Sequence, residues 1–446
     1  MKYTLTLLIA VTMGASFHPA AAQESALMSF MRQSPQALRT NPAGLSDSVR
    51  WFMGIPFLLS HLGLDLDAGI AYNDVIRRNA DNSLQINPDA ADKIANARTM
   101  ANFNYELLSF GFRFMKQHMI TFSLSATADA SILLPGELAS LLINGNTPGK
   151  PLSVTSEINA MAYVEAALGY SFAINENWKA GLRFKYLRGG AGARGKDIRA
   201  TIHTDPDDYK MTIDANAAVD VAYIDPAESV TGNTGMAFDA GIYYNTPVKG
   251  LSIGASMVDW GWIDWTSNPK IYETKMVNGS FEFSGLASLN DDFDHIIDTL
   301  KNAFDFDDRD GKAYRSVLPG KIYLSAAYSL TKNDKFGFLF STRALDHFSR
   351  TTFTLMYNRS VGKWFSVAVG NNFMASKLFN PSMAFNLRGG AFQWYMAVEN
   401  LSSFNPAGIR SLNLQMGFNL TFLNISKNRK KQAAPNDPET GKNSEQ

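Results

Sequence analysis

The chain of 446 residues lacks cysteine altogether, and its charges cancel, with 41 basic and 41 acidic residues. Without cysteine it can form neither a disulfide framework nor a lipid-modified N-terminal cysteine, so packing and hydrogen bonds must hold the fold. A neutral chain shows no sign of binding nucleic acid or a strongly charged partner. We therefore expect no nucleic-acid partner.

Long apolar runs are also missing, apart from one at the start. Lys2 precedes the run "LTLLIAVTMGASF", and Ala20 and Ala22 then offer the small-x-small pattern of a signal peptidase site. We predict that residues 1–22 are a signal peptide. After it, no run approaches the roughly 20 mainly apolar residues that a transmembrane helix needs.

What the chain has instead is strict alternation of apolar and polar residues. In the last such stretch one face carries apolar residues and the other polar ones: Leu412, Leu414, Met416, Phe418, Leu420 and Phe422 against Asn413, Gln415, Gly417, Asn419 and Thr421. A period of two predicts a β-strand whose faces meet different surroundings. Two architectures fit: a soluble β-sandwich or solenoid, and a closed barrel in an outer membrane.

The lengths of the connections favour the barrel. We expect strands near 62–73, 101–114, 119–132, 158–172, 177–188, 195–203, 209–222, 236–246, 250–260, 320–331, 335–345, 349–360, 363–374, 380–388, 391–400 and 410–422. Connections after the even-numbered strands, such as "MKQH" and "TDPDD", are all short, and every long insertion follows an odd-numbered one. Outer-membrane barrels sort their loops in this way. The sequence thus predicts an all-β protein, a transmembrane antiparallel barrel of 14 to 16 strands over residues 48–424.

Two individual segments of this barrel need separate comment. The segment "VRWFMGIPFL" fits either a first strand or part of a plug. In the strand from 101 to 114 the apolar residues change parity between Leu107 and Ser109, which predicts a β-bulge, because one extra residue reverses the alternation.

The closing strand carries a further pattern. Gln415, Gly417, Leu420 and Phe422 follow the order polar residue, glycine and two spaced apolar residues. This order resembles the signal that the outer-membrane barrel assembly machinery reads on a closing strand. Residues 425–446 are mostly charged or polar and carry no aromatic side chain, so we expect a disordered periplasmic tail.

The tetrapeptide NPAG occurs twice, at Asn41 to Gly44 and at Asn405 to Gly408. Asn-Pro followed by glycine is a sharp turn wherever it stands, and we interpret the second copy as a turn in an external loop. Before the first copy, Leu27, Phe30 and Met31 recur at helical spacing. A short segment ahead of a wide barrel must dangle or enter the lumen, and we predict a small N-terminal plug over residues 23–47.

With these features the chain resembles the long-chain fatty acid transporter (FadL-like) barrels. In that family the N-terminal segment is a hatch with an Asn-Pro-Ala motif that gates a path for hydrophobic compounds. Asn41, Pro42 and Ala43 match this motif residue by residue. The chain is also similar to an uncharacterised barrel family with segments like "LLSFGFR", "DPDDY" and "LPGKIYL". The resemblance implies that Leu27, Phe30 and Met31 belong to the hatch.

Two functions follow, from different classes. The first is passive transport of small hydrophobic molecules across the outer membrane of a Gram-negative bacterium, with membrane lipids, the assembly machinery and a hydrophobic ligand as partners. The alternative is a non-transporting structural or secretion-associated barrel that acts as a binding partner. An apolar tunnel would favour transport, and a sealed, salt-bridged lumen the alternative. The sequence has no HExxH or GxSxG motif, and we expect no catalytic residues, cofactor or metal.

Overall fold

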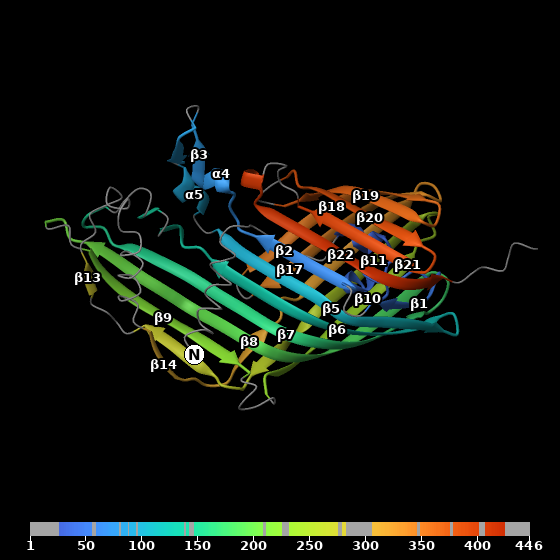
Figure 1. The fold of residues 1–446 in the computed structure, drawn as a ribbon, viewed down its shortest axis with the longest axis horizontal. Coiled ribbons are helices and arrows are strands. Elements are labelled where there is room, and N and C mark those ends of the chain that lie inside the picture. Colours follow the sequence, from blue (N-terminus) through green and yellow to red (C-terminus); the bar gives the residue numbers. More distant parts are fainter. Residues whose placement is uncertain are drawn as a thin grey trace, which may run out of the picture.

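The computed structural model describes residues 26–55, 59–79, 82–87, 89–94, 97–137, 140–141, 147–207, 211–224, 232–274, 279–281, 306–345, 348–374, 378–400 and 406–423. The predicted signal peptide and C-terminal tail lie outside these residues. Within them the chain is almost entirely β-structure (Figure 1). No helix among the described residues combines the length and the apolar character needed to cross a membrane.

A ring of 16 hydrogen-bonded strands forms the body of the molecule. Its members are β1 (Val49–Gly54), β2 (His61–Asp67), β5 (Arg98–Phe114), β6 (His118–Leu133), β7 (Leu152–Ala173), β8 (Trp178–Thr204), β10 (Thr234–Asn245), β11 (Leu251–Trp265), β15 (Tyr314–Val317), β16 (Lys321–Ser329), β17 (Asp334–Leu345), β18 (Phe348–Val361), β19 (Phe365–Phe373), β20 (Pro381–Gly389), β21 (Phe392–Glu399) and β22 (Ser411–Leu423). Neighbouring strands pair in antiparallel fashion, and β22 closes the ring on both β1 and β2. The predicted all-β barrel of 14 to 16 strands is confirmed.

Two places in the ring are each shared by two short strands. β1 and β2 both stand between β22 and β5, and β15 and β16 both pair with β11. Each of these two pairs of strands fills a single position, so the ring has two fewer strand positions than it has strands. The segment "VRWFMG", which the sequence left open, is a wall strand.

The wall continues past the ring on one side only. β9 (Met211–Tyr223) pairs with the second half of β8, beyond the half that pairs with β10. The sheet then continues beside β9 through β12 (Lys270–Thr274), β13 (Gly279–Phe281) and β14 (Phe306–Asp310). A small unit stands apart from the ring at the end of β2 (Figure 1). It comprises α4 (Tyr72–Val75), the hairpin of β3 (Ile76–Arg78) and β4 (Leu84–Ile86), and α5 (Ala90–Ile94).

The two faces of the wall have opposite chemistry. On β22 the residues Asn413, Gln415 and Asn419 are at most 4% exposed and point into the ring, whereas their apolar neighbours face outward. Outward-facing leucines elsewhere are the most exposed apolar residues of the wall, such as Leu182 at 65% and Leu168 at 58%. An apolar exterior around a polar interior inverts the soluble pattern and is that of a transmembrane barrel.

One strand prediction is wrong. Residues 177–188 and 195–203 were expected as two strands with a turn near 190–194, but β8 is continuous from Trp178 to Thr204. Consequently the connection from β8 to β9 lies at the end of the barrel opposite the turn that joins β7 to β8. The predicted bulge is confirmed, because the pairing of β5 with β6 shifts between Glu106 and Leu108.

Gly189 and Gly192 of β8 leave room for a large side chain to pack against the strand. Trp265, fully buried at the end of β11, lies against Gly189 and Gly192 of β8, and its Nε1 donates to Ser316 Oγ at 3.0 Å. A Cβ added at Gly189 or Gly192 would come within 2.6 or 2.5 Å of the indole. Glycine inside a strand often marks such a close approach.

This contact yields a stability prediction. Gly192→Ala should lower the free energy of unfolding by about 1–3 kcal/mol, because an over-packed core site forces its neighbours to shift. Gly190→Ala is the matched control, since its Cβ would meet only Ala162 O at 3.5 Å. Urea unfolding of the barrel refolded in micelles measures both. Equal stability of the two variants would contradict the packing role of Trp265.

Candidate functional site

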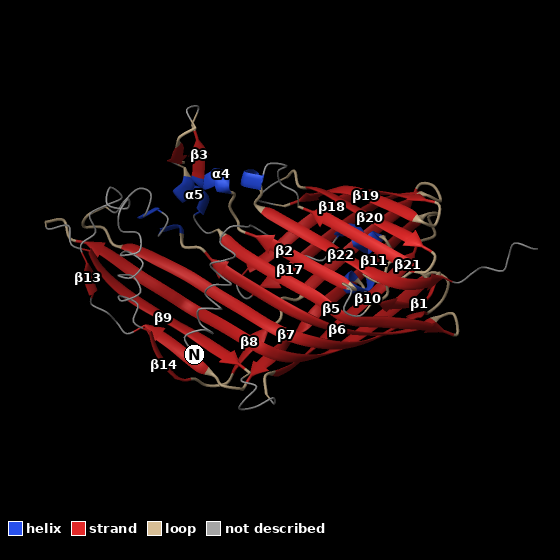
Figure 2. Cartoon of the chain, in the orientation of Figure 1, coloured by secondary structure: helices blue, strands red, loops and turns tan. Residues whose placement is uncertain are grey.

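Residues 26–47, which precede β1, lie inside the ring. α2 (Ala26–Phe30) and α3 (Ala37–Thr40) are the two short helices within it in Figure 2. We call residues 26–47 the N-terminal segment. Leu27, Phe30 and Met31 are at most 5% exposed and join an apolar cluster on the inner wall. The cluster includes Val258, Tyr323, Leu339, Met356, Ala368, Ala384, Tyr395 and Ala397.

A buried carboxylate holds the start of α2. Glu399 of β21 is 3% exposed and accepts hydrogen bonds from the backbone amides of Leu27 at 2.9 Å and Ala26 at 3.2 Å. These amides open a helix and have no partner inside it, so a negative side chain satisfies them well. Asn372 in turn donates to Glu399 at 3.3 Å. The first turn of the segment is thus fixed to β21, the strand that pairs with β22.

The first NPAG sits against the opposite wall. The Asn41 amide donates to the backbone oxygens of Ile242 at 3.1 Å and Ala255 at 3.3 Å, and its Oδ1 accepts from the Ala43 amide at 2.9 Å. The Gly44 amide donates to Asn41 O at 2.7 Å and closes the turn. One side chain therefore shapes the turn and ties it to β10 and β11.

Glycines on the wall make room for the segment. A Cβ at Gly241 would collide with the Asn41 amide, and one at Gly181 would lie 2.6 Å from the Pro42 carbonyl carbon. On the other side, Gly337 and Gly370 face Phe30 and Leu27 in the same way. The barrel wall is shaped around this segment at both of its ends.

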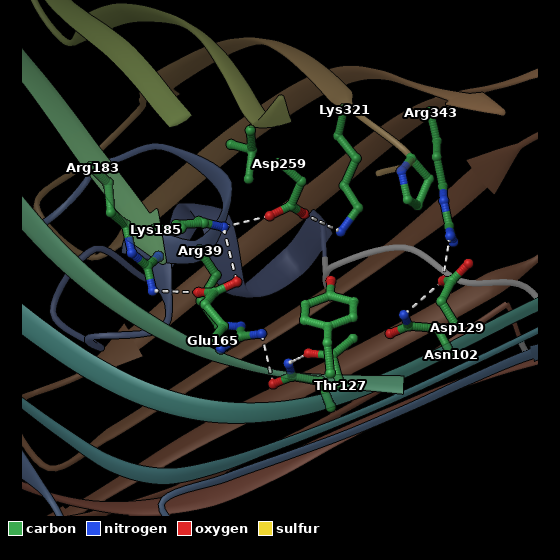
Figure 3. Close-up of a pocket in the computed structure, with 14 residues that line it drawn as sticks. Arg39, Asn102, Thr127, Asp129, Glu165, Arg183, Lys185, Asp259, Lys321 and Arg343 are labelled. Atoms are coloured by element: carbon green, nitrogen blue, oxygen red, sulfur yellow. Dashed lines mark hydrogen bonds and ion pairs between the residues drawn. The ribbon is translucent and has the colours of Figure 1, made fainter. Parts of the chain in front are cut away.

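A layer of paired charges crosses the lumen beside the segment (Figure 3). Lys185 is central: its Nζ lies 3.1 Å from Asp239, 3.5 Å from Glu165 and in short contact with Asp259. Asp259 also bridges to Lys321 at 2.9 Å. Cations and carboxylates are present in equal number: Arg39, Arg183, Lys185, Lys321 and Arg343, with Glu106, Asp129, Glu165, Asp239 and Asp259.

A backbone irregularity places one of these carboxylates. Asp259 has a positive φ of 61°, and the ladder between β10 and β11 shifts at this level, between Phe238 and Ala240. The bulge turns the Asp259 side chain into the lumen next to Val258. The free space within the charged layer is ≈ 30 Å³, which holds about one water.

A larger, more apolar hollow adjoins this layer. It measures ≈ 240 Å³, is lined by Met161, Leu318, Pro319 and Ala344, and shares Asp129 and Pro319 with the charged layer. The described lumen thus contains an apolar hollow, a paired charged layer and the N-terminal segment.

The predicted assembly residues lie together on β22 but on both of its faces. Gln415 and Gly417 point inward, where Gly417 is packed against Ser60 and Tyr395. Leu420 and Phe422 point outward, and Phe422 stacks on Trp51 of β1 with ring centroids 3.8 Å apart. Recognition of these residues by the assembly machinery stays a prediction.

The second NPAG has a different setting. Pro406 to Gly408 form one 3-10 turn that contacts α4, while Asn405 lies outside the described residues. Arg410 pairs with Asp74 of α4 at 2.9 Å. Although burial opposes ionisation, the Ala71 amide and Arg410 hold the pKa of Asp74 below its ordinary value. This copy anchors the external unit, far from the first.

Sequence reasoning missed the groups that hold the N-terminal segment. The sequence had suggested no role for Glu399, Gly181 or Gly241. The sequence did contain one signal for such contacts, namely a glycine at an inward-facing position of a barrel strand. Among the described residues, no group of three or more His, Asp or Glu side chains is placed to hold a metal ion.

Comparison with known families gives one match. A family described as "Family of unknown function (DUF5723)" matches residues 42–399. The chain belongs to this family. No curated protein matches the sequence.

Solved structures similar to this DUF5723 chain are barrels of the type that the sequence resembles. The deltaS2 mutant of the monoaromatic hydrocarbon channel TodX has 11% identity and a TM-score of 0.49, covering 88% of this chain and 95% of that one. A Pseudomonas aeruginosa FadL homologue has 10% identity and a TM-score of 0.40, covering 91% and 98%. The Ralstonia pickettii toluene transporter TbuX has 8% identity and a TM-score of 0.36, covering 87% and 94%.

The fit of the N-terminal segment can be tested with a single thiol, because the chain has no other. Ser29→Cys places a reporter on α2, where Ser29 is 7% exposed. Adding Gly181→Val should speed maleimide labelling roughly ten- to a hundredfold, since ~1–3 kcal/mol of over-packing shifts a population by that factor. Gly389→Val is the control, with nothing within 4 Å of its Cβ. Equal labelling rates would show that the wall does not hold the segment.

The assembly prediction concerns the outward residues of β22. Replacing both Leu420 and Phe422 with Asp places charges on the lipid-facing side, at a cost that grows with depth in the bilayer. The variant should fail to accumulate as a heat-modifiable barrel in the outer-membrane fraction. Normal accumulation of this variant would refute the predicted assembly signal.

Proposed function

We propose that this protein is an outer-membrane barrel for passive transport of small hydrophobic molecules, with the N-terminal segment as its hatch. One observation carries the proposal. The segment fills the lumen, yet none of its described residues pairs with a ladder strand of the wall. It can leave without breaking the barrel.

The contacts of the segment suit a movable element. Apolar packing of Leu27 and Phe30 and the hydrogen bonds of Asn41 and Glu399 hold it closed. A hydrogen bond to a charged group contributes about 1.5–3 kcal/mol, and a neutral one about 0.5–1.5 kcal/mol. Such a sum gives a closed state that a few favourable contacts with cargo can shift.

The apolar hollow supports a hydrophobic cargo. Met161, Leu318 and Pro319 line a space next to the charged layer, on the route toward the hatch. Small apolar ligands bind in such hollows by losing contact with water. The sequence resemblance to fatty acid transporters implies the same class of cargo.

A second candidate function is the non-transporting structural or secretion-associated barrel. The charged layer favours it, because Lys185 and Asp259 join several strands by ion pairs across the lumen. A passage for apolar molecules has to part these pairs. In this alternative the segment and the ion pairs are permanent fillings of the barrel.

Mutation of the first NPAG separates the two functions. Changing both Asn41 and Pro42 to Ala removes the bonds to Ile242 and Ala255 and should loosen the hatch, while the ladder stays intact. Uptake of small hydrophobic probes by cells should rise several-fold, and membrane levels should stay normal. The same change at Asn405 and Pro406 is the control and should leave uptake unchanged.

The outcome decides between the candidates. Higher uptake in the first variant alone supports a hatch. If both variants match the wild type, and if Asp259→Asn combined with the first variant also leaves uptake unchanged, the barrel does not transport and the alternative holds.

A further inference from the structure

A second large hollow lies between the N-terminal segment and the wall, at the end of the barrel where the short turns are. It measures ≈ 300 Å³ and lies between the segment and the starts of β8 and β17. Its charged lining residues are Arg32, Asp47, Lys179 and Lys335. Apart from Phe30 and Met31, the neutral lining residues are polar: Gln33, Ser46, Asn245, Asn358, Ser360, Ser366 and Asn386.

The charges of this hollow do not balance. Three cations face one carboxylate, Asp47, and that carboxylate is shared, because it pairs with Lys179 and also with Arg113 at 3.3 Å. The charged layer deeper in the lumen is paired in equal number. The hollow differs from that layer, in which each cation has a carboxylate within ion-pair distance.

Arg32 and Lys335 account for the excess. Arg32 Nε donates to Gly44 O at 2.7 Å, and its guanidinium lies over the Tyr243 ring with 4.0 Å to the centroid. Among the described residues, neither Arg32 nor Lys335 has a carboxylate within ion-pair distance. Arg32 is close enough to Lys179 and Lys335 for their like charges to repel. Both Arg32 and Lys335 also border a neighbouring space of ≈ 280 Å³.

We propose that this hollow binds a small oxyanion, a phosphate or carboxylate group, between Arg32 of the N-terminal segment and Lys179 and Lys335 of the wall. A guanidinium whose Nε is already used and whose plane is fixed on an aromatic ring still presents its terminal amino groups to such a group. The two lysines supply point charges from β8 and β17, and polar side chains of the lining complete the site.

Binding would tie the segment to the wall. Without an anion, the repulsion between Arg32 and Lys335 pushes the segment away from β17, and with one the same residues attract a common partner. The anion thus stabilises the closed segment from the side of the short turns. The site requires only the observed arrangement of segment and wall, and it stands whether or not the barrel transports.

The test uses the purified full-length barrel in detergent, with inorganic phosphate as the probe and chloride at equal ionic strength as the reference. Phosphate should bind saturably by calorimetry and raise Tm. Lys335→Gln should weaken phosphate binding about tenfold, as expected for one charged hydrogen bond. In phosphate-free buffer the same variant should raise Tm, because it removes a repulsion.

This reversal of sign separates a binding site from a merely structural lysine, whose loss would lower Tm in both buffers. Lys332→Gln, an exposed change in the turn just before β17, is the matched control and should behave as the wild type. Phosphate that acts no better than chloride, or equal binding by wild type and Lys335→Gln, would overturn the proposal.

A second arm identifies the source of the anion. Short-chain phosphatidylglycerol below its micelle concentration carries the same phosphate on a lipid headgroup. Tighter binding than inorganic phosphate would identify a lipid as the ligand, and weaker binding a free oxyanion. Both results support the site, whereas binding of the lipid that survives Lys335→Gln contradicts it.

Discussion

Closure of the β-ladder is the constraint on which the rest of this molecule depends. A strand facing lipid has no water to satisfy its backbone amides, so the sheet must close on itself. β22 meets that need by pairing with both β1 and β2. Once the ring is closed, successive side chains of every strand point to lipid or to lumen.

The inward side chains then need partners of their own. Ion pairs satisfy the charged ones around Lys185, and the N-terminal segment satisfies others. Glu399 is an example: this buried carboxylate accepts hydrogen bonds from two backbone amides of α2. The segment and the wall therefore complete each other chemically, although no ladder joins them.

The charged layer and the hollow beside Arg32 and Lys335 differ in their balance of charge, and this difference gives them different roles. In the layer around Asp259 each cation has a carboxylate, which joins strands across the lumen. At the hollow beneath the segment, Arg32 and Lys335 exceed the available carboxylates. A balanced layer needs no ligand, whereas an unbalanced one gains by taking up an anion. Movement of the segment would change both the layer and the hollow, because Arg32 borders the hollow and Arg39 belongs to the charged layer.

The sequence alone determined the features that depend on neighbouring residues along the chain. Alternation decided which residues of β22 face lipid, a parity change located the bulge near Leu107, and NPAG defined a turn, since Asn41 bonds to Ala43 only two residues away. The tertiary structure decided everything that depends on distant contacts. A turn was expected near residues 190–194, but Trp265, far along the chain, occupies the space beside Gly189 and Gly192, and β8 runs through this stretch without a turn. In the same way, Glu399 could be assigned to the lumen from its parity, while its bond to α2, 372 residues earlier in the chain, exists only because the ring closes.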